Sequence, residues 1–106
     1  MARPPSERFE TSITKDNLWI YILTLLKKKE LYAYELNGRI RKQFGFSPGN
    51  VTAYIVLQRL KADGYVKATS KKQEGGPVRH YYATTPKGLA ELKKAKVIYG
   101  KYGKLF

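Results

Sequence analysis

Apolar residues recur at every third or fourth position along the first half of this 106-residue chain, which is the spacing of one face of a helix. The pattern predicts three helices, at about residues 16–29, 32–44 and 50–62. Only a short turn separates the second helix from the third. Two helices joined so closely indicate a helix-turn-helix.

Residues at the predicted boundaries agree with these helices. Thr14 or Asp16 could cap the first helix, because a short side-chain oxygen accepts free backbone N–H groups of the first turn. Gly45 suits a left-handed stop for the second helix. Both Ser47, which is followed by a proline, and Asn50 are candidate starts for the third helix.

The period changes from helical to alternating after Gly64. Residues 65–69 and 78–83 alternate in the manner of strands, and the polar, glycine-containing segment between them reads as the tip of a hairpin. Thr85, followed by a proline, then predicts the start of another helix. Helix, helix-turn-helix, hairpin and helix in this order predict an α+β, mainly helical fold: a winged helix-turn-helix with three helices, a two-stranded wing and a C-terminal helix.

We expect three segments in the chain: a flexible N-terminal arm at 1–13, the winged helix-turn-helix domain at 14–88, and a C-terminal helix at 89–106 that makes a dimer. The arm could be helical near Phe9, and Arg3 could reach a DNA groove, although a simple disordered end also explains this composition.

Apolar residues of the C-terminal helix follow heptad spacing, which is typical of a seam between helices. They are Leu92, Ala95, Tyr99, Tyr102 and Phe106. We expect this seam to form the dimer interface. The alternative is that Leu92, Ala95 and Tyr99 cover the chain's own core. Gly100 and Gly103 argue against a rigid helix end.

The chain carries 21 basic and 8 acidic residues, a formal net charge of +13. So much positive charge in a small domain favours a polyanionic partner, and nucleic acid is the common one. Ten of the basic residues lie between Val66 and Phe106, against two acidic ones. A solvated surface, anionic lipid or ribosomal RNA remain alternatives, since charge gives only the sign of the partner.

Several classes of protein are excluded by what the chain lacks. With no cysteine and only His80, it can form neither a disulfide nor a multi-histidine or cysteine-ligated metal site, so we expect no metal and no cofactor. No catalytic constellation or phosphate-binding motif is present, so we expect no enzyme. The longest apolar run, 18–23, is too short for a membrane span, and the start lacks a secretion signal. A cytoplasmic protein is expected.

Three stretches in order resemble the PadR-like family of transcriptional regulators. They are Tyr34-Glu35-Leu36, the segment 54–66 with its tyrosine, paired leucines and glycine, and the segment 75–88 with Tyr81-Tyr82 and its threonine–glycine helix start. The sequence departs from the family at Ala33, where a glycine is usual, and in a turn over 47–52 that is about two residues longer.

The resemblance covers about residues 17–95 and implies a homodimer that binds a pseudo-palindromic promoter site, mostly as a repressor. Relatives are thought to sense small planar compounds. Trp19 and the tyrosines could line a cleft for such an effector, but an apolar helix face is more typical of a core position, and we assign no effector.

The third helix would read DNA in the major groove if Ala53, Val56, Leu57 and Leu60 face inward. The remaining positions then offer hydrogen-bonding and small apolar groups to base edges or phosphates. The candidate contacts are Asn50, Val51, Thr52, Tyr54, Ile55, Gln58 and Arg59. For Val51 and Ile55 a protein contact is the alternative, and for Tyr54 a half-buried ring with a wet hydroxyl.

The predicted wing adds Lys71, Lys72, Arg79 and His80, whose cationic side chains suit phosphates or the minor groove. The alternative is a solvated hairpin tip. Two other functions stay open: a non-specific nucleoid or RNA-binding protein, and a winged helix that docks another protein.

Overall fold

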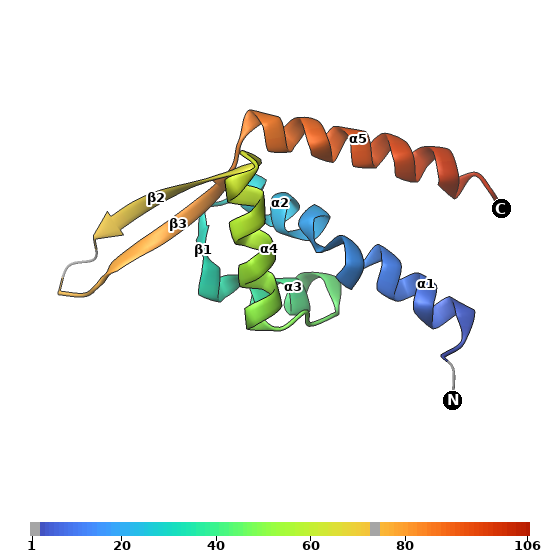
Figure 1. Cartoon of the computed structure of the whole chain (residues 1–106), viewed down its shortest axis with the longest axis horizontal. Helices are drawn as coiled ribbons and strands as arrows, with labels where there is room; N and C mark the ends of the chain where they lie inside the picture. Colours follow the sequence, from blue (N-terminus) through green and yellow to red (C-terminus); the bar gives the residue numbers. More distant parts are fainter. Residues whose placement is uncertain (1–2, 73–74) are drawn as a thin grey trace.

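The computed structural model describes residues 3–72 and 75–106, and of Lys71 and Lys72 it describes the backbone only. Five α-helices and three strands are described, in the order shown in Figure 1. The wing extends from one side of the helical body, while α1 (Pro5–Ile13) and α5 (Pro86–Gly103) extend from the other. The winged helix-turn-helix predicted from the sequence is confirmed.

Helix α1 occupies the segment where we expected a flexible arm. Pro5 stands at the first helical position and Glu7 lies in the first turn, and both favour a helix start. None of its residues is buried, so α1 stands out from the body.

The central helix α2 (Leu18–Lys28) is almost wholly apolar, and a 3₁₀ turn at Lys15–Asn17 leads into it. The capping that we predicted at its start is wrong. The Thr14 hydroxyl donates instead to the carbonyl oxygen of Glu10 at 2.7 Å, closing the last turn of α1. Asn17 is the N-cap, and no side-chain cap is present. Burial of the apolar face therefore holds this helix.

The helix-turn-helix starts later than its apolar pattern suggests. Residues 31–32 form a short strand, β1 (Leu31–Tyr32), and a 3₁₀ turn at Ala33–Glu35 precedes α3 (Leu36–Phe44). Gly45 ends α3 in the left-handed conformation, with φ at 84°, as predicted.

The turn between α3 and α4 (Asn50–Ala62) is shaped by one side chain of α3. The Oδ1 atom of Asn37 accepts hydrogen bonds from the backbone N–H of Gly49 at 2.8 Å and from the Ser47 hydroxyl at 3.1 Å. Neither Ser47 nor Asn50 caps α4, contrary to our prediction. Gly49 is the N-cap, with φ at 91°, and Asn50 is the first helical residue. The bounds predicted for this helix are confirmed.

The wing consists of β2 (Val66–Lys72) and β3 (Val78–Thr84), paired antiparallel from Val66↔Thr84 to Lys72↔Val78. The sequence did not indicate β1, because two residues are too few to show an alternation. It pairs with β3 through Leu31↔Tyr82 and Tyr32↔Tyr81, so β3 is the middle strand of three.

The core lies where α2, α3 and α4 meet over the base of the sheet. Its fully buried side chains are Leu18, Ile22, Leu23, Leu26, Leu36, Ile40 and Leu57. The Thr84 hydroxyl donates to the carbonyl oxygen of Leu23 at 2.8 Å and so ties the wing to α2. The base of the wing is therefore fixed to the helical body.

Helix α5 begins as predicted, with the Thr85 hydroxyl accepting a hydrogen bond from the N–H of Gly88. A Cβ atom at Gly88 would collide with the carbonyl oxygen of Tyr65, so only glycine fits there. Two expectations for this helix are wrong. It continues through Gly100 to Gly103, and Leu89, which we expected to face inward, is 40% exposed.

Candidate nucleic-acid interface

One face of α4 is left uncovered by the core. Ala53, Leu57 and Leu60 point inward, which turns the opposite residues to the surface. Exposed on that surface are Asn50, Val51, Thr52, Tyr54, Ile55 and Arg59. Val51 is 74% exposed, more than a core residue at any other helix rotation would be. The rotation of this helix predicted from its apolar spacing therefore matches the structure.

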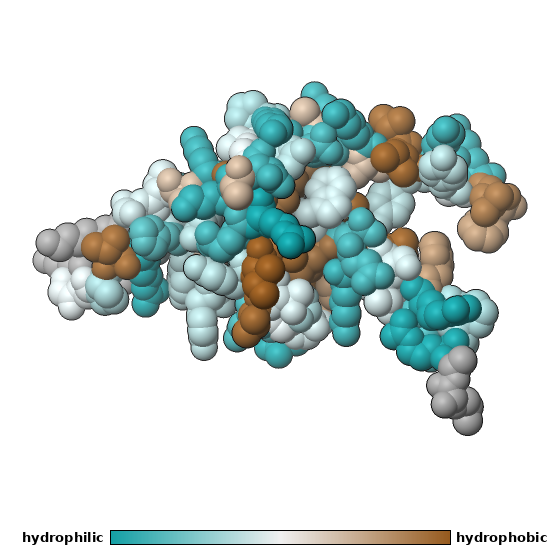
Figure 2. Space-filling view, viewed as in Figure 1, coloured by the Kyte–Doolittle hydropathy of each residue, from teal (hydrophilic) through white to brown (hydrophobic). Residues whose placement is uncertain are grey.

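Hydrophobic atoms on this face form a band along α4, with hydrophilic surface on either side (Figure 2). Val51 and Ile55 are the large apolar residues exposed there. An apolar band bordered by polar groups is well matched to a major groove, because thymine methyl groups and hydrogen-bonding base edges alternate there.

Gln58 lies apart from the other candidates on α4. It is half-buried, and its Nε2 atom donates to the hydroxyl of Tyr82 at 3.1 Å. Tyr82 belongs to β3 and is only 6% exposed. The amide that we expected to face DNA is thus directed at the base of the wing.

Two of the predicted wing residues have described side chains. The guanidinium of Arg79 lies over the ring of Tyr32, 4.7 Å from its centroid. His80 is exposed, and its Nδ1 atom is 3.1 Å from the hydroxyl of Ser70 on β2. The side chains of Lys71 and Lys72 lie outside the described part of the structure, which places only their backbone, in β2.

The space between α4 and the wing is a shallow groove with an aromatic lining. Residues from three elements line it: Tyr32, Ala33, Tyr34, Tyr54, Arg79, His80 and Tyr82. A neighbouring hollow, lined by Ala33, Tyr34, Asn50, Val51 and Tyr54, continues it to the N-terminus of α4. The structure thereby joins the predicted residues on the helix and on the wing into one surface.

The sequence analysis did not assign Tyr34 to this surface, although the residue opens the motif Tyr34-Glu35-Leu36. It is 76% exposed and borders both hollows. Helical spacing alone could not find it, because it lies in the 3₁₀ turn before α3. An exposed tyrosine offers a hydroxyl to phosphate and a ring to sugar or base.

A second exposed surface lies between α1 and α5. A cleft of about 510 Å³ is lined by Phe9, Ile13, Ile98, Tyr99, Tyr102, Gly103, Leu105 and Phe106. Figure 1 shows the two helices diverging toward their free ends. The described residues at this cleft are almost all apolar, which is unusual for a surface that faces only water.

The seam predicted on α5 is divided by the structure. Ala95 is buried and Leu92 half-buried in the chain's own fold, as the alternative reading expected. Tyr99, Tyr102 and Phe106 are exposed. Burial and the neighbouring Tyr99 raise the pKa of Tyr21, whose hydroxyl donates to the carbonyl oxygen of Ile13 at 2.6 Å. Tyr21 thus anchors the end of α1 beside α5.

Other kinds of site find no support in the part of the chain that is described. Across residues 3–72 and 75–106 no helix is long and apolar enough to cross a membrane. The same residues contain no group of three or more side chains suited to hold a metal ion.

A helix-turn-helix whose second helix stands uncovered beside a β-hairpin defines the winged helix-turn-helix class of protein. Within that class the chain belongs to the PadR-like family of transcriptional regulators, whose family model matches residues 22–94. The family named by the sequence motifs is confirmed. Its members regulate transcription and are not enzymes.

Solved structures of the family resemble this one closely. A PadR-like transcriptional regulator from Bacillus cereus is 30% identical with a TM-score of 0.74, over 91% of each chain. PadR of Bacillus subtilis, solved in complex with operator DNA, is 26% identical with a TM-score of 0.69, over 76% of this chain and 46% of that one. An uncharacterized protein of Lysinibacillus sphaericus is 31% identical over 86 residues, 79% of each chain.

Proposed function

We propose that this chain is a sequence-specific regulator that binds double-stranded DNA as a homodimer and represses transcription, acting in the cytoplasm. The observation that carries the proposal is the continuous surface formed by α4 and the wing, in a chain of net charge +13. The Bacillus subtilis relative crystallised with operator DNA supports a duplex as the partner.

In this proposal the exposed face of α4 lies in the major groove. Asn50 and Thr52 would bond base edges or phosphates near the start of the helix, and Val51 and Ile55 would contact thymine methyl groups. Tyr54 and Arg59 lie at the flanks of this face, where they would contact the backbone. Gln58 is a weaker candidate for base contact, because its amide already bonds Tyr82.

The wing would hold the flanking backbone. Arg79 and His80 lie on the same groove as Tyr54, and Lys71 and Lys72 precede the hairpin tip. Contacts from long cationic side chains to phosphates add affinity for any sequence. Helix and wing therefore divide the work between specificity and affinity.

The cleft between α1 and α5 would be closed by α5 of a second copy. Its lining and the exposed row of Ile98, Tyr102, Leu105 and Phe106 are apolar on the same side of the molecule, so two copies could cover each other's rows. Two winged helices related by a two-fold axis would read two half-sites of a pseudo-palindrome.

Light scattering tests the dimer. A chain cut after Lys96 loses the exposed row but keeps Leu92 and Ala95 in the core. We expect the full chain to have the mass of a dimer and the cut chain that of a monomer. A cut chain that stays dimeric would place the interface elsewhere.

Selection of bound fragments from genomic DNA, followed by footprinting, tests the function. A discrete site with two-fold symmetry is expected. Uniform coating of the DNA would instead indicate an architectural protein, and no protection would indicate a module that docks another protein. A reporter gene behind the selected site, with and without the protein, then gives the sign of regulation, which we expect to be repression.

A further inference from the structure

Arg79 is held by an aromatic ring that belongs to a different part of the fold. Its guanidinium lies 4.7 Å from the centroid of the Tyr32 ring, although 47 positions separate the two residues in sequence. A guanidinium that stacks on a ring uses its flat face. Its N–H groups lie in the plane of the guanidinium and remain geometrically suited to a phosphate.

The sheet register brings the ring to this position. Tyr32 of β1 pairs with Tyr81 of β3, and their rings meet edge to face with centroids 5.8 Å apart. Arg79 and Tyr81 are two residues apart on β3, so they project from the same face of the sheet. Because β1 has only two residues, Tyr32 lies at its end, next to Arg79.

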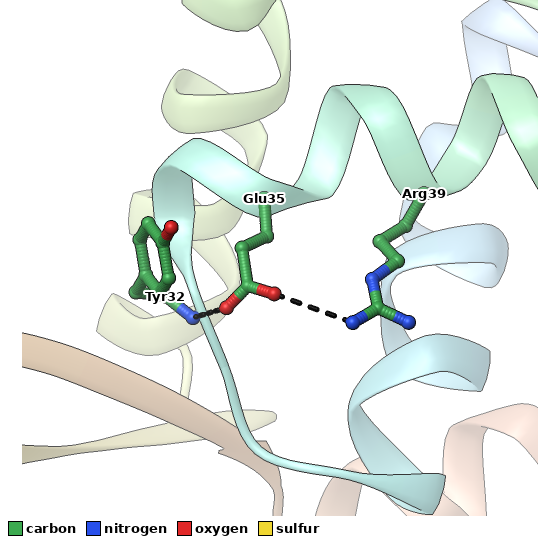
Figure 3. A network of polar contacts seen from close by, with 3 residues as sticks. All are labelled: Tyr32, Glu35 and Arg39. Atoms are coloured by element: carbon green, nitrogen blue, oxygen red, sulfur yellow. Dashed lines mark hydrogen bonds and ion pairs between the residues drawn. The ribbon is translucent and has the colours of Figure 1, made fainter.

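Tyr32 is in turn connected to the helix-turn-helix, as Figure 3 shows. Its backbone N–H donates to Oε1 of Glu35 at 3.3 Å, and Oε2 of the same carboxylate is paired with Arg39 of α3 at 3.4 Å. The ring under Arg79 is thus tied to the start of α3, and α3 leads directly into the turn before α4.

From this arrangement we propose that Tyr32 is a positioning residue for DNA binding: its ring holds the Arg79 guanidinium at a fixed distance from the recognition helix, ready for a backbone phosphate. The inference rests on the proposed function and adds a role for a residue that contacts no DNA itself. A flexible arginine would lose side-chain freedom on binding, whereas a stacked arginine has lost much of it beforehand.

The test compares three variants in two backgrounds. Tyr32→Phe keeps the ring, Tyr32→Leu removes it, and each is combined with Arg79→Ala. We expect Arg79→Ala to weaken binding to the selected site roughly tenfold, as the loss of one charge-assisted contact. Tyr32→Leu should weaken it severalfold, Tyr32→Phe should not, and Tyr32→Leu should have no further effect once Arg79 is absent.

The outcomes separate positioning from simple stability. Equal weakening by Tyr32→Leu in both backgrounds would overturn the proposal, because the ring would then act without Arg79. Unchanged binding by Tyr32→Leu would overturn it as well. Lys87→Ala is the matched control, since Lys87 lies over the ring of Tyr65 at 4.6 Å, outside the groove beside α4. It should leave DNA affinity unchanged.

A measurement without DNA keeps this inference separate from the proposed function. Side-chain protons of Arg79 above an aromatic ring resonate upfield in an NMR spectrum. The shift should persist in Tyr32→Phe and vanish in Tyr32→Leu. If it is absent from the wild-type chain, the proposal fails whether or not the protein binds DNA. If the shift is present and wild-type chain binds no duplex, the proposed function fails, and with it the role of the stack in DNA binding.

Discussion

At the scale of single residues, exposed apolar side chains mark the surface of α4 as clearly as charge does. Val51 and Ile55 remain exposed even though the core nearby is well filled. Asn50 stands beside them at the first turn of the helix, where a side chain can reach the floor of a major groove. The identity of these few residues would therefore decide which DNA sequence is preferred.

Replacing Asn50 with alanine should reduce discrimination more than affinity. A bidentate contact from an asparagine to adenine contributes about 1–3 kcal/mol of preference over the wrong base. We expect competition titrations to show a smaller ratio between the selected site and scrambled DNA for Asn50→Ala. Arg79→Ala is the comparison, since it should weaken both DNAs alike. A reversed pattern would mean that helix and wing have been placed wrongly.

Gly88 is a residue-scale requirement of the fold rather than of the site. Gly88→Ala places a methyl group against the Tyr65 carbonyl oxygen, and overpacking of this kind costs about 1–3 kcal/mol. Gly38→Ala in α3 meets no atom within 4 Å and should stabilise the chain by up to ~1 kcal/mol. Urea unfolding measures both. Equal stabilities for the two variants would contradict the close approach of α5 to Tyr65.

At the scale of elements, the turn between α3 and α4 is set by a side chain and not by its own sequence. Asn37 lies on α3 and bonds the turn at both Ser47 and Gly49. The start of α4 is therefore fixed relative to α3, which matters because this end of α4 is the one that would enter the groove.

Asn37→Ala should lower the free energy of unfolding by about 1–2 kcal/mol, since the N–H of Gly49 loses its acceptor. Asn37→Asp keeps an acceptor oxygen and should lose less. Chemical denaturation gives both values. If the alanine and aspartate variants are equally stable, the hydrogen bonds to Ser47 and Gly49 contribute nothing to the turn.

At the scale of the whole molecule, net charge makes the binding of any duplex dependent on salt. A protein that neutralises phosphates releases condensed cations, so affinity falls as salt rises. The charge of +13 is distributed over a chain with two candidate interfaces, and only the one formed by α4 and the wing is rich in hydrogen-bonding groups.

The slope of log affinity against log salt should change by about 0.9 for each phosphate contact removed, and by about twice that in a symmetric dimer. Arg79→Ala should flatten the slope by this amount, and Asn50→Ala should not change it. Titrations at four or more salt concentrations measure the slopes. An unchanged slope for Arg79→Ala would remove Arg79 from the phosphate contacts.

The sequence alone determined the helix bounds of α4, the wing, the fold class and the family. These follow from local periodicity and from motifs that are contiguous along the chain. Helix ends were less predictable: Thr14 and Asn50 each have a suitable capping side chain, yet neither caps α2 or α4, because packing of the apolar faces fixes where these helices begin.

Tertiary structure alone decided which side chains meet. The strand β1, the bond from Gln58 to Tyr82, the stack of Arg79 on Tyr32 and the exposure of Tyr34 all depend on residues distant in sequence. It also divided the predicted seam, burying Ala95 and leaving Tyr102 and Phe106 exposed. Periodicity shows which face of a helix is apolar, but only packing decides whether the chain itself or another molecule covers it.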